Sequence, residues 1–457
     1  MHGRCGARGA YRSVAGTHYC RRVLTYLTSS EDGYDALLAG FNTAYPQTPD
    51  AVVAVSTPDE VLEALAHARS LGLPGRVLAT GHGTHGPLTT GLVLNIAGLS
   101  SVTVDPVART ATVGGGTRWA AVVDAAAPHG LAPITGSSPN VGVAGYLAGG
   151  GLGPLARSHG YSSDWVRGFT LATAAGEILT VTEDENAELF WALRGGKGGF
   201  GVVLDVTVEL VPLPSLYAGA LVFAEEHIEQ VLRGWAAWTG DAPSDVTTSI
   251  LIAGFPPIEQ IPEPFRGRRL LMLRFAYPGD VSRGEELAAP LRALAPVYLD
   301  GVRPLPLTDV GLIHNDPSDP GPGWGVGGLL TSVGGGFADA ILGVVGPGSR
   351  SPFLGVEVRH IGAATRTDVP SGSAVGGRHS NYAFHVLGAP DPSLFEAVLP
   401  AAGAAFIASI GEWIAPETNA NFANAESIAA AWPADVAARL ESIRAAVDPT
   451  GMFPLSV

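Results

Sequence analysis

One segment limits the possible folds of this chain more than any other. It runs from Gly136 to Tyr161 and reads GSSPNVGVAGYLAGGGLGPLARSHGY. So many glycines leave few side chains to pack, and glycine adopts backbone conformations that other residues avoid. We therefore expect this segment to wrap its backbone around a ligand.

The overall composition sets the class of protein. A chain of 457 residues exceeds the size at which one hydrophobic core keeps growing, so two or three domains are expected. The formal net charge of −15 disfavours nucleic acid as a partner, because nucleic-acid binding needs clustered Lys and Arg. Runs of about eighteen apolar residues, which a membrane span requires, are absent from the sequence. We expect a soluble protein whose partner is a small molecule, and no oligomeric state is indicated.

The N-terminal residues 1–25 contain basic residues but no continuous apolar core, so a secretory signal is not supported. We interpret them as a flexible leader. The two cysteines of the chain, Cys5 and Cys20, both lie there. Two cysteines cannot form a disulfide framework, and a cytoplasmic location fits this usage better.

A second glycine-rich loop, VLATGHGTHG at residues 77–86, directly follows an expected strand. Consecutive N–H groups in such a loop make a concave site for a pyrophosphate. The alternative is a glycine-rich turn that carries two surface histidines. His82 and His85 could also form a metal-binding pair, but no third ligand with suitable spacing follows, so no metal is predicted.

Two further segments have unusual glycine patterns. Residues 149–153 read GGGLG, a loose match to GxGxxG that lacks the strand before it and the acidic residue after it. A flexible loop is the alternative there. Residues 188–203 read ELFWALRGGKGGFGVV, and a helix does not tolerate that run of glycines. We expect a helix, then a turn at which the backbone approaches a neighbour closely, then a strand.

The remaining pattern divides the chain near Leu213. The first part opens with a strand from Ala51, followed by a helix with Thr57 as N-cap, Pro58 in the first turn and Gly72 at the end. After Pro212, alternating segments such as SILIAGF, RLLMLRFAY and FLGVEVRHI indicate strands of a separate sheet. The tail predicts an amphipathic helix that ends before Pro449.

The order and spacing of these motifs resemble those of the FAD-linked oxidases with the vanillyl-alcohol-oxidase (PCMH-type) fold, in the berberine-bridge-enzyme-like branch. That family's VRSGGHS loop matches VLATGHG, its GxCPTVGVGGxxxGGGxG loop matches GSSPNVGVAGYLAGGGLG, and its DLFWAxRGGGGxFGVV matches ELFWALRGGKGGFGVV. The resemblance covers residues 45–211 and returns near the C-terminus.

The resemblance implies an α+β fold in which a two-part FAD-binding domain joins a substrate domain, whose antiparallel sheet is covered by helices. On this chain the division becomes residues 1–25 as leader, 26–212 as FAD-binding domain, 213–414 as substrate-binding domain, and 415–457 as a segment that returns to the FAD domain.

The resemblance also implies the cofactor and how it is held. His82 takes the place of the family's histidine that bonds to the flavin 8α-methyl carbon, while Leu78 replaces the family's arginine. Many members add a cysteine bond, but Ser138 stands at that position, so we predict a single attachment. The other residues implied to hold FAD are Ala79, Thr80, Gly81, Gly83, Thr84, Asn140, Val141, Val143, Gly145, Gly149, Gly150, Gly153, Val203 and Asn421.

Two further correspondences bear on the reaction and on the C-terminus. Val141 holds the position that gates oxygen in plant relatives, where valine is typical of oxidases. Asn421 matches an asparagine that reaches the isoalloxazine, and Phe422 replaces the tyrosine that follows it in the family.

The candidates for catalysis are Glu357, Tyr146 and Tyr382. Glu357 and Arg359 share one face of an expected strand, which is compatible with a salt bridge or with a base and its anchor. A buried carboxylate with a raised pKa could take a proton while hydride leaves for flavin N5. Tyr146 lies in the loop expected near the flavin ring.

The leading hypothesis is an oxidase that takes a hydride from a small alcohol, sugar, phenolic or polyketide-like substrate and reduces O2 to H2O2. A flavin-dependent dehydrogenase or a monooxygenase-like tailoring enzyme is the alternative among enzymes. A catalytically inactive FAD-binding protein is the alternative of another class.

Overall fold

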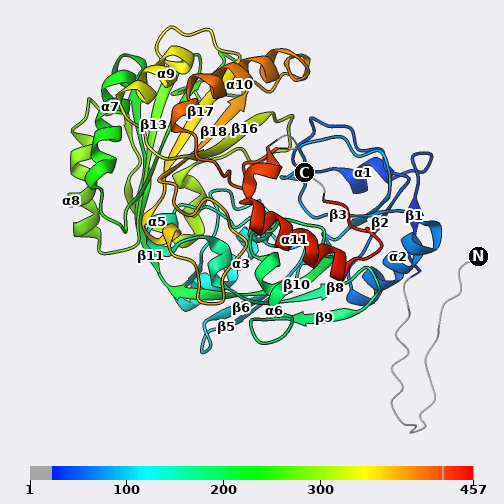
Figure 1. The fold of residues 1–457 in the computed structure, drawn as a ribbon. Helices are drawn as coiled ribbons and strands as arrows, with labels where there is room; N and C mark the ends of the chain where they lie inside the picture. The colour runs from blue at the N-terminus through cyan, green and yellow to red at the C-terminus, as the bar shows by residue number, and fades with distance from the viewer. Residues whose placement is uncertain (1–22, 425–426, 456–457) are drawn as a thin grey trace, which may run out of the picture.

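A computed structural model describes residues 23–424 and 427–455 of the chain, folded around three β-sheets (Figure 1). The predicted leader, with Cys5 and Cys20, lies outside the described residues apart from residues 23–25. Helices and sheets are mixed throughout, which confirms the α+β class.

The first sheet has the strand order β1-β2-β4-β3 and is largely parallel. Its strands are β1 Tyr26–Leu27, β2 Ala51–Ala54, β3 Gly75–Leu78 and β4 Leu92–Asn95. Helix α2 (Pro58–Leu71) packs Val61, Leu65 and their neighbours into the core beneath this sheet. Both predicted caps are present: the Thr57 side chain accepts a hydrogen bond from the Glu60 N–H, and Gly72 ends the helix in a left-handed conformation. The short helix α1 (Tyr34–Leu38) contacts β2.

The second sheet is antiparallel, with the order β5-β6-β10-β8-β9 and β7 paired to β10. Its strands are β5 Val102–Asp105, β6 Thr110–Gly114, β7 Leu131–Pro133, β8 Val166–Ala172, β9 Ile178–Val181 and β10 Val202–Pro212. Helices α3 (Trp119–Ala126) and α6 (Ala187–Leu193) pack on it. The expected helix, glycine turn and strand over residues 188–203 are therefore confirmed.

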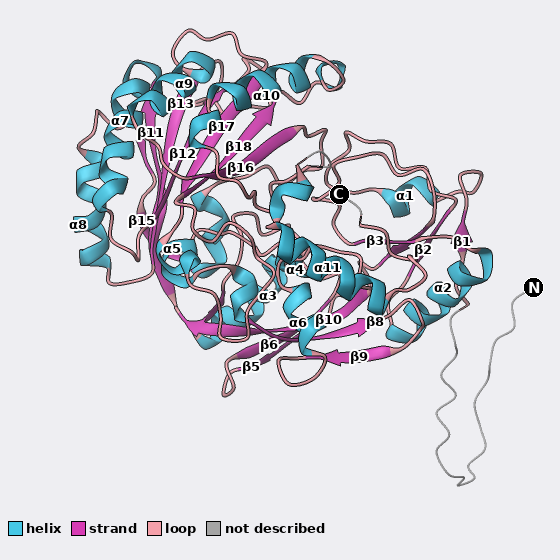
Figure 2. Ribbon diagram, in the orientation of Figure 1, coloured by secondary structure: helices cyan, strands magenta, loops and turns pink. Residues whose placement is uncertain are grey.

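The third sheet is antiparallel and larger, with the order β14-β11-β13-β12-β17-β18-β16 and β15 paired to β11. Its strands are β11 Ser215–Ala224, β12 Thr247–Gly254, β13 Arg269–Tyr277, β14 Leu299–Asp300, β15 Arg303–Pro306, β16 Gly325–Leu330, β17 Phe353–His360 and β18 Tyr382–Gly388. Helices α7 (Ile228–Trp238), α8 (Val281–Arg292), α9 (Gly335–Val345) and α10 (Val398–Ser409) cover its outer side (Figure 2). The chain passes from the second sheet to the third between Pro212 and Ser215.

The alternation of side chains along the third sheet separates core from site. Ile250, Leu273 and Val358 belong to the core beneath the outer helices. Their strand neighbours point to the opposite face because successive residues of a strand alternate. That opposite face carries Arg274 and Glu357, both buried, and it is turned toward the first two sheets.

The C-terminal segment returns to the first sheet. After helix α11 (Ala434–Val447), the Met452 carbonyl accepts a hydrogen bond from the Gly75 N–H at 2.8 Å, and Phe453 enters the core of that sheet. The Arg444 guanidinium donates to the carbonyls of Gly196 and Gly198. The end of the chain thus holds the glycine run after α6 in place.

The segment 136–161 differs from its prediction as a loop. It contains α4 (Val143–Ala148) and α5 (Ala156–His159). Val143 and Leu147 are fully buried against the second sheet, so tertiary packing stabilises α4 where local propensity is poor.

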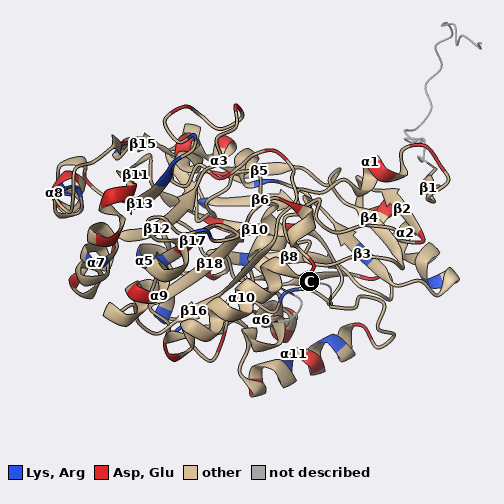
Figure 3. Cartoon of the chain, turned by 90° about the horizontal axis from the view of Figure 1, so that it is seen from above, with Lys and Arg blue, Asp and Glu red and all other residues tan. Residues whose placement is uncertain are grey.

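Asp and Glu residues are spread over the outer helices and loops (Figure 3). Among the described helices, none combines the length and the apolar character needed to cross a bilayer.

Candidate active site

The loop after β3 presents unpaired backbone donors. The N–H groups of Gly81, His82 and Gly83 have no acceptor among the described residues. Gly81 has φ 68° and lies so close to Gly40 that a Cβ atom would come within 2.6 Å of the Gly40 Cα. Only glycine allows this approach. Consecutive free N–H groups are what an anion-binding concavity requires, and the pyrophosphate site in this loop stays a prediction.

His82 is fixed in orientation and kept neutral. Its Nδ1 lies 3.0 Å from the Thr80 hydroxyl, and its ring stacks on Phe41 with centroids 3.9 Å apart. Burial, with Arg118 nearby, lowers its pKa to about 4. Its Nε2 is buried without a partner in the described part of the chain. A neutral imidazole with a free nitrogen can act as a nucleophile. Phe41 was not predicted, because no motif in the sequence marks it.

Helix α4 lies beside this loop. A Cβ atom on Gly142 would contact the Thr80 side chain at 3.3 Å, so the two glycine-rich segments are adjacent. Tyr146 extends from α4 past Gly151, where a Cβ atom would come within 2.5 Å of its ring. Its hydroxyl is buried beside the Ser162 hydroxyl, and neither makes a hydrogen bond of good geometry within the described residues. Burial raises the pKa of Tyr146 to about 12, so the hydroxyl keeps its proton at neutral pH.

Some backbone donors of α4 and of the glycines after it have acceptors within the protein, whereas the N–H groups of Ala144 and Gly145 have none among the described residues. The predicted cofactor contacts of this segment stay predictions. The N–H of Val143 donates to the Thr117 carbonyl at 2.9 Å, and those of Gly149 and Gly150 donate to carbonyls of α4. Gly149 and Gly150 also allow close packing, since Cβ atoms would meet Asn421 at Gly149 and Val375 at Gly150. At Gly153 a Cβ atom would lie 1.9 Å from the Thr135 carbonyl oxygen.

Asn421 connects the C-terminal segment to α4. Its Oδ1 accepts a hydrogen bond from the Gly151 N–H at 2.8 Å, and its Nδ2 donates to the Tyr146 carbonyl at 3.1 Å. The observed contacts of Asn421 therefore position the loop that carries Tyr146. The predicted contact with the isoalloxazine stays a prediction.

A group of basic side chains lies between the glycine-rich loops and the third sheet. The Lys197 Nζ donates to the Ala420 carbonyl at 3.0 Å, and burial lowers its pKa to about 8. The pKa of His85 is lowered to about 4 by burial, with Lys197 and His385 nearby. Within the described residues no group of three or more His, Cys, Asp or Glu side chains is arranged to hold a metal ion.

Glu357 differs from the predicted base. Its carboxylate contacts the Arg274 Nη1 at 2.8 Å and the Arg359 Nε at 2.9 Å. Burial alone would raise the pKa of Glu357, but Arg359 and Arg274 hold it well below its usual range. The expected raised pKa is therefore wrong, because two cations flank the carboxyl group. The salt bridge with Arg359, the other interpretation of this strand, is confirmed.

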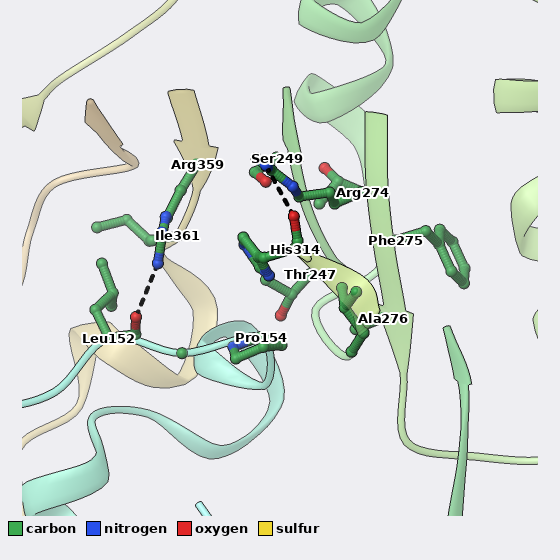
Figure 4. A pocket seen from close by; sticks show the side chains of 13 residues that line it. Leu152, Pro154, Thr247, Ser249, Arg274, Phe275, Ala276, His314, Arg359 and Ile361 are labelled. Atoms are coloured by element: carbon green, nitrogen blue, oxygen red, sulfur yellow. Dashed lines mark hydrogen bonds between the residues drawn. The ribbon is translucent and has the colours of Figure 1, made fainter. Parts of the chain in front are cut away.

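Arg274 and His314 were missed by the sequence analysis. Arg274 interrupts the apolar run RLLMLRFAY of β13, and a single charge in such a run is a signal that could have been used. His314 follows the 3-10 helix η5 (Leu307–Ile313), in a region with no recognisable pattern. Both line a narrow pocket with Arg359 and Ser249 (Figure 4).

Tyr382 is not part of this site. It begins β18 on the face that packs beneath the outer helices, where its hydroxyl hydrogen-bonds the Thr239 hydroxyl at 2.8 Å. Its ring stacks on His360, which is also on that face. The strand alternation directs this side chain into the helix-covered core, and a catalytic role for Tyr382 stays a prediction without support from this geometry.

The remaining cofactor residues lie in the expected elements. Ala79 and Thr84 flank the donor loop, Ser138 to Val141 precede α4, and Val203 is the second residue of β10. Their contacts with a cofactor stay predictions.

Comparisons with known proteins agree with this geometry. Residues 49–182 match a family model described as an FAD binding domain. Over 275 residues the chain is 30% identical to (R)-6-hydroxynicotine oxidase of Paenarthrobacter nicotinovorans and 27% identical to xylooligosaccharide oxidase of Thermothelomyces thermophilus. These alignments cover 60% and 58% of the chain, and 58% and 52% of the relatives, so the chain spans only about half the length of the curated relatives it matches.

Solved structures extend the likeness to nearly the whole chain. 6-Hydroxy-D-nicotine oxidase from Arthrobacter nicotinovorans superposes with a TM-score of 0.82 at 23% identity, over 97% of this chain and 99% of that one. The chain has the PCMH-type flavoprotein fold. A glucooligosaccharide oxidase from Acremonium strictum, at 19% identity, shares this fold with a TM-score of 0.79 over 95% of both chains.

The residues of this chain fit a bound FAD. Cβ atoms built on Gly83 and Gly145 meet nothing within 4 Å, so both glycines border open space. The free donors of residues 81–83 and the unpaired Nε2 of His82 border the same loop, and the buried hydroxyl of Tyr146 lies on the adjacent α4. Buried polar atoms in proteins normally have partners, and a dinucleotide with its ring beside His82 would supply them.

Proposed function

We propose that the protein is an FAD-dependent oxidase of a small organic substrate, with its flavin attached through His82 alone. The observation that carries this proposal is the pair formed by the neutral, unpartnered His82 and the three free N–H groups of residues 81–83. The match of residues 49–182 to an FAD binding domain and the oxidase names of the relatives support it.

The residues of the chain would have separate roles in binding and in the reaction. Bound FAD would supply a two-electron acceptor, taking a hydride from the substrate and passing both electrons to O2 to give H2O2. The donors of residues 81–83 would bind the diphosphate, and Tyr146 would donate its hydroxyl proton in a hydrogen bond to a substrate oxygen. Glu357 would stay ionised and hold the two arginines in position, rather than accept a proton.

A single attachment follows from the side chain at position 138. Ser138 is half-buried next to α4 and carries a hydroxyl, whereas a thioether needs a thiol. Substituting Ser138 with alanine would therefore leave the attachment unchanged.

The attachment can be tested on purified protein by acid precipitation. In the wild type we expect yellow colour to stay in the pellet, and in His82→Ala we expect it to move to the supernatant. His85→Ala is the matched control, because His85 lies three residues away in the same loop and is also neutral. Colour released from the wild type would overturn the covalent bond, and colour released only from His85→Ala would move the site.

The oxidase assignment is tested against its alternatives by rapid mixing. We expect a substrate panel of sugars, alcohols, phenols and 6-hydroxynicotine to contain a compound that bleaches the flavin without air, and O2 to restore the colour quickly with H2O2 as product. Slow recovery in O2 would favour a dehydrogenase. No bleaching by any compound would favour an inactive FAD-binding protein.

A further inference from the structure

We infer that the pocket formed by Arg274, His314 and Arg359 receives an anionic oxygen of the substrate, so that the enzyme acts on small organic acids or on compounds with an ionised hydroxyl group. This inference deepens the proposed function and rests on it. It names a substrate class that the likeness to known proteins does not select.

The lining of the pocket is basic. Arg274 comes from β13, Arg359 from β17 and His314 from the segment after η5, and no Asp or Glu is among the described residues that line the pocket. Figure 4 shows the His314 ring between the two arginine side chains, with Leu152 and Pro154 of the glycine-rich segment below them in this view. The Arg359 Nη1 donates to the Leu152 carbonyl at 3.2 Å, which ties the pocket to the FAD-binding part.

The acidic groups around the pocket do not cancel its charge. Glu357 lies behind the arginines and, within the described chain, is the one carboxylate in contact with both, so two positive charges face one negative charge. Asp316 influences Arg359 electrostatically, but its carboxylate accepts a hydrogen bond from the Ser137 hydroxyl at an exposed position. The side of the pocket formed by Arg274 and Arg359 therefore carries a net positive charge. Little water is present there to screen this charge from a bound group.

His314 supplies an independent observation. Its side chain is only 5% exposed, and neither ring nitrogen has a hydrogen-bond partner in the described chain. The nearest carboxylate oxygen, on Glu357, is 3.5 Å from Nε2. Burial and the two arginines keep the pKa of His314 well below its ordinary value. A neutral ring carries one N–H donor, and an anionic oxygen in the pocket would satisfy it.

The positive charge of Arg274 and Arg359 determines which class of ligand the pocket favours. A cationic amine would be repelled by Arg274 and Arg359, and a neutral amide would gain hydrogen bonds but no charge attraction. Hydrogen bonds that involve an ionised group are about twice as strong as those between neutral groups. The anion is therefore the occupant that this pocket favours.

The test is isothermal titration of the purified, flavin-loaded protein with three probes of nearly equal size: benzoate, benzamide and benzylamine. We expect benzoate to bind at least about 10-fold more tightly than benzamide, in line with one charge-assisted contact, and benzylamine not to bind. Equal affinity for benzoate and benzamide, tighter binding of benzylamine, or no binding of benzoate would overturn the inference. The flavin spectrum is recorded separately, so a colourless protein would count against the proposed function instead.

Variants locate the binding in the pocket. Arg359→Gln is expected to weaken benzoate by about 10-fold and to leave benzamide unchanged. Arg268→Gln is the matched control, because Arg268 is exposed and packs over Tyr298 outside the pocket. If Arg359→Gln fails to fold, Glu357→Gln is the second variant. It removes a negative charge beside the arginines, so the affinity for benzoate is expected to increase. Unchanged benzoate affinity in whichever of the two variants folds would contradict the inference.

Discussion

Glu357, Arg274 and Arg359 form a buried cluster in which neighbours decide what each group can do. Both guanidinium groups contact the carboxylate, and the pKa of Glu357 is lowered despite burial. A carboxyl group whose pKa is lower in the folded state stabilises the protein above its unfolded pKa, and this contribution is lost as pH falls through the folded value. The contribution of Glu357 is therefore constant across neutral pH.

At this scale we predict that Glu357→Gln lowers the free energy of unfolding by about 3 to 5 kcal/mol, because it removes one partner of a buried ion pair. The loss is expected to be equal at pH 8 and at pH 5, as measured by urea denaturation. The exposed Glu226→Gln is the control and is expected to change little. A loss that grows between pH 8 and pH 5 would show that the pKa of Glu357 is raised instead.

Some glycines of the site loops pack closely against neighbouring atoms, and others face open space. This difference gives a prediction at the scale of the element. Gly153 packs against the Thr135 carbonyl, whereas Gly83 faces open space. We expect Gly153→Ala to destabilise the apoprotein by about 1 to 3 kcal/mol through overpacking. We expect Gly83→Ala to leave apoprotein stability unchanged and to weaken FAD binding. Thermal melts without FAD and titration of the apoprotein with FAD measure the two effects, and a Gly83→Ala variant that binds FAD like the wild type would contradict the proposed site.

The N-terminus of α2 offers a second test at this scale. The Thr57 hydroxyl accepts the Glu60 N–H at 3.2 Å. Thr57→Ala is expected to cost about 1 kcal/mol in the free energy of unfolding, and Thr57→Ser is expected to restore most of it. Equal stability of Thr57→Ala and wild type in urea denaturation would contradict the capping role.

Elements with strong local signals were predictable from the sequence. The caps of α2 and the alternating strands β12, β13 and β17 follow from residue type and period. Helix α4 was not predictable, because its stability comes from burial of Val143 and Leu147 against a distant sheet.

Part of the site was predictable for similar reasons. The loop around His82 is contiguous in sequence and has a recognisable pattern. The pocket of Arg274, His314 and Arg359 is assembled by three separate segments of the third-sheet region, so no local pattern could reveal it. The position of Tyr382 in the helix-covered core was not predictable, because the sequence does not show which face of β18 meets the outer helices.

On the scale of the whole molecule, the site lies where the third sheet meets the two others, so its geometry depends on contacts across that boundary. Arg378, just before β18, forms a buried ion pair with Asp164 of η2 (Ser162–Trp165) at 2.6 Å. The side chain of Asn421 and the C-terminal segment also cross to the glycine-rich loop.

We predict that Asp164→Asn lowers the free energy of unfolding by up to about 3 kcal/mol, because it removes the charged partner of a buried ion pair. Asp368 still contacts Arg378 in this variant. The exposed Asp184→Asn is the control. Urea denaturation followed by tryptophan fluorescence measures the change. A stability equal to that of the wild type would show that this pair does not hold the two parts together.

The central claim is that His82 carries the flavin, and tandem mass spectrometry of proteolytic peptides tests it most directly. The account predicts one flavin-modified peptide, with the modification on His82 and none on the peptide that contains Ser138. Unmodified His82, in a protein that also stays colourless after incubation with FAD, would contradict the account.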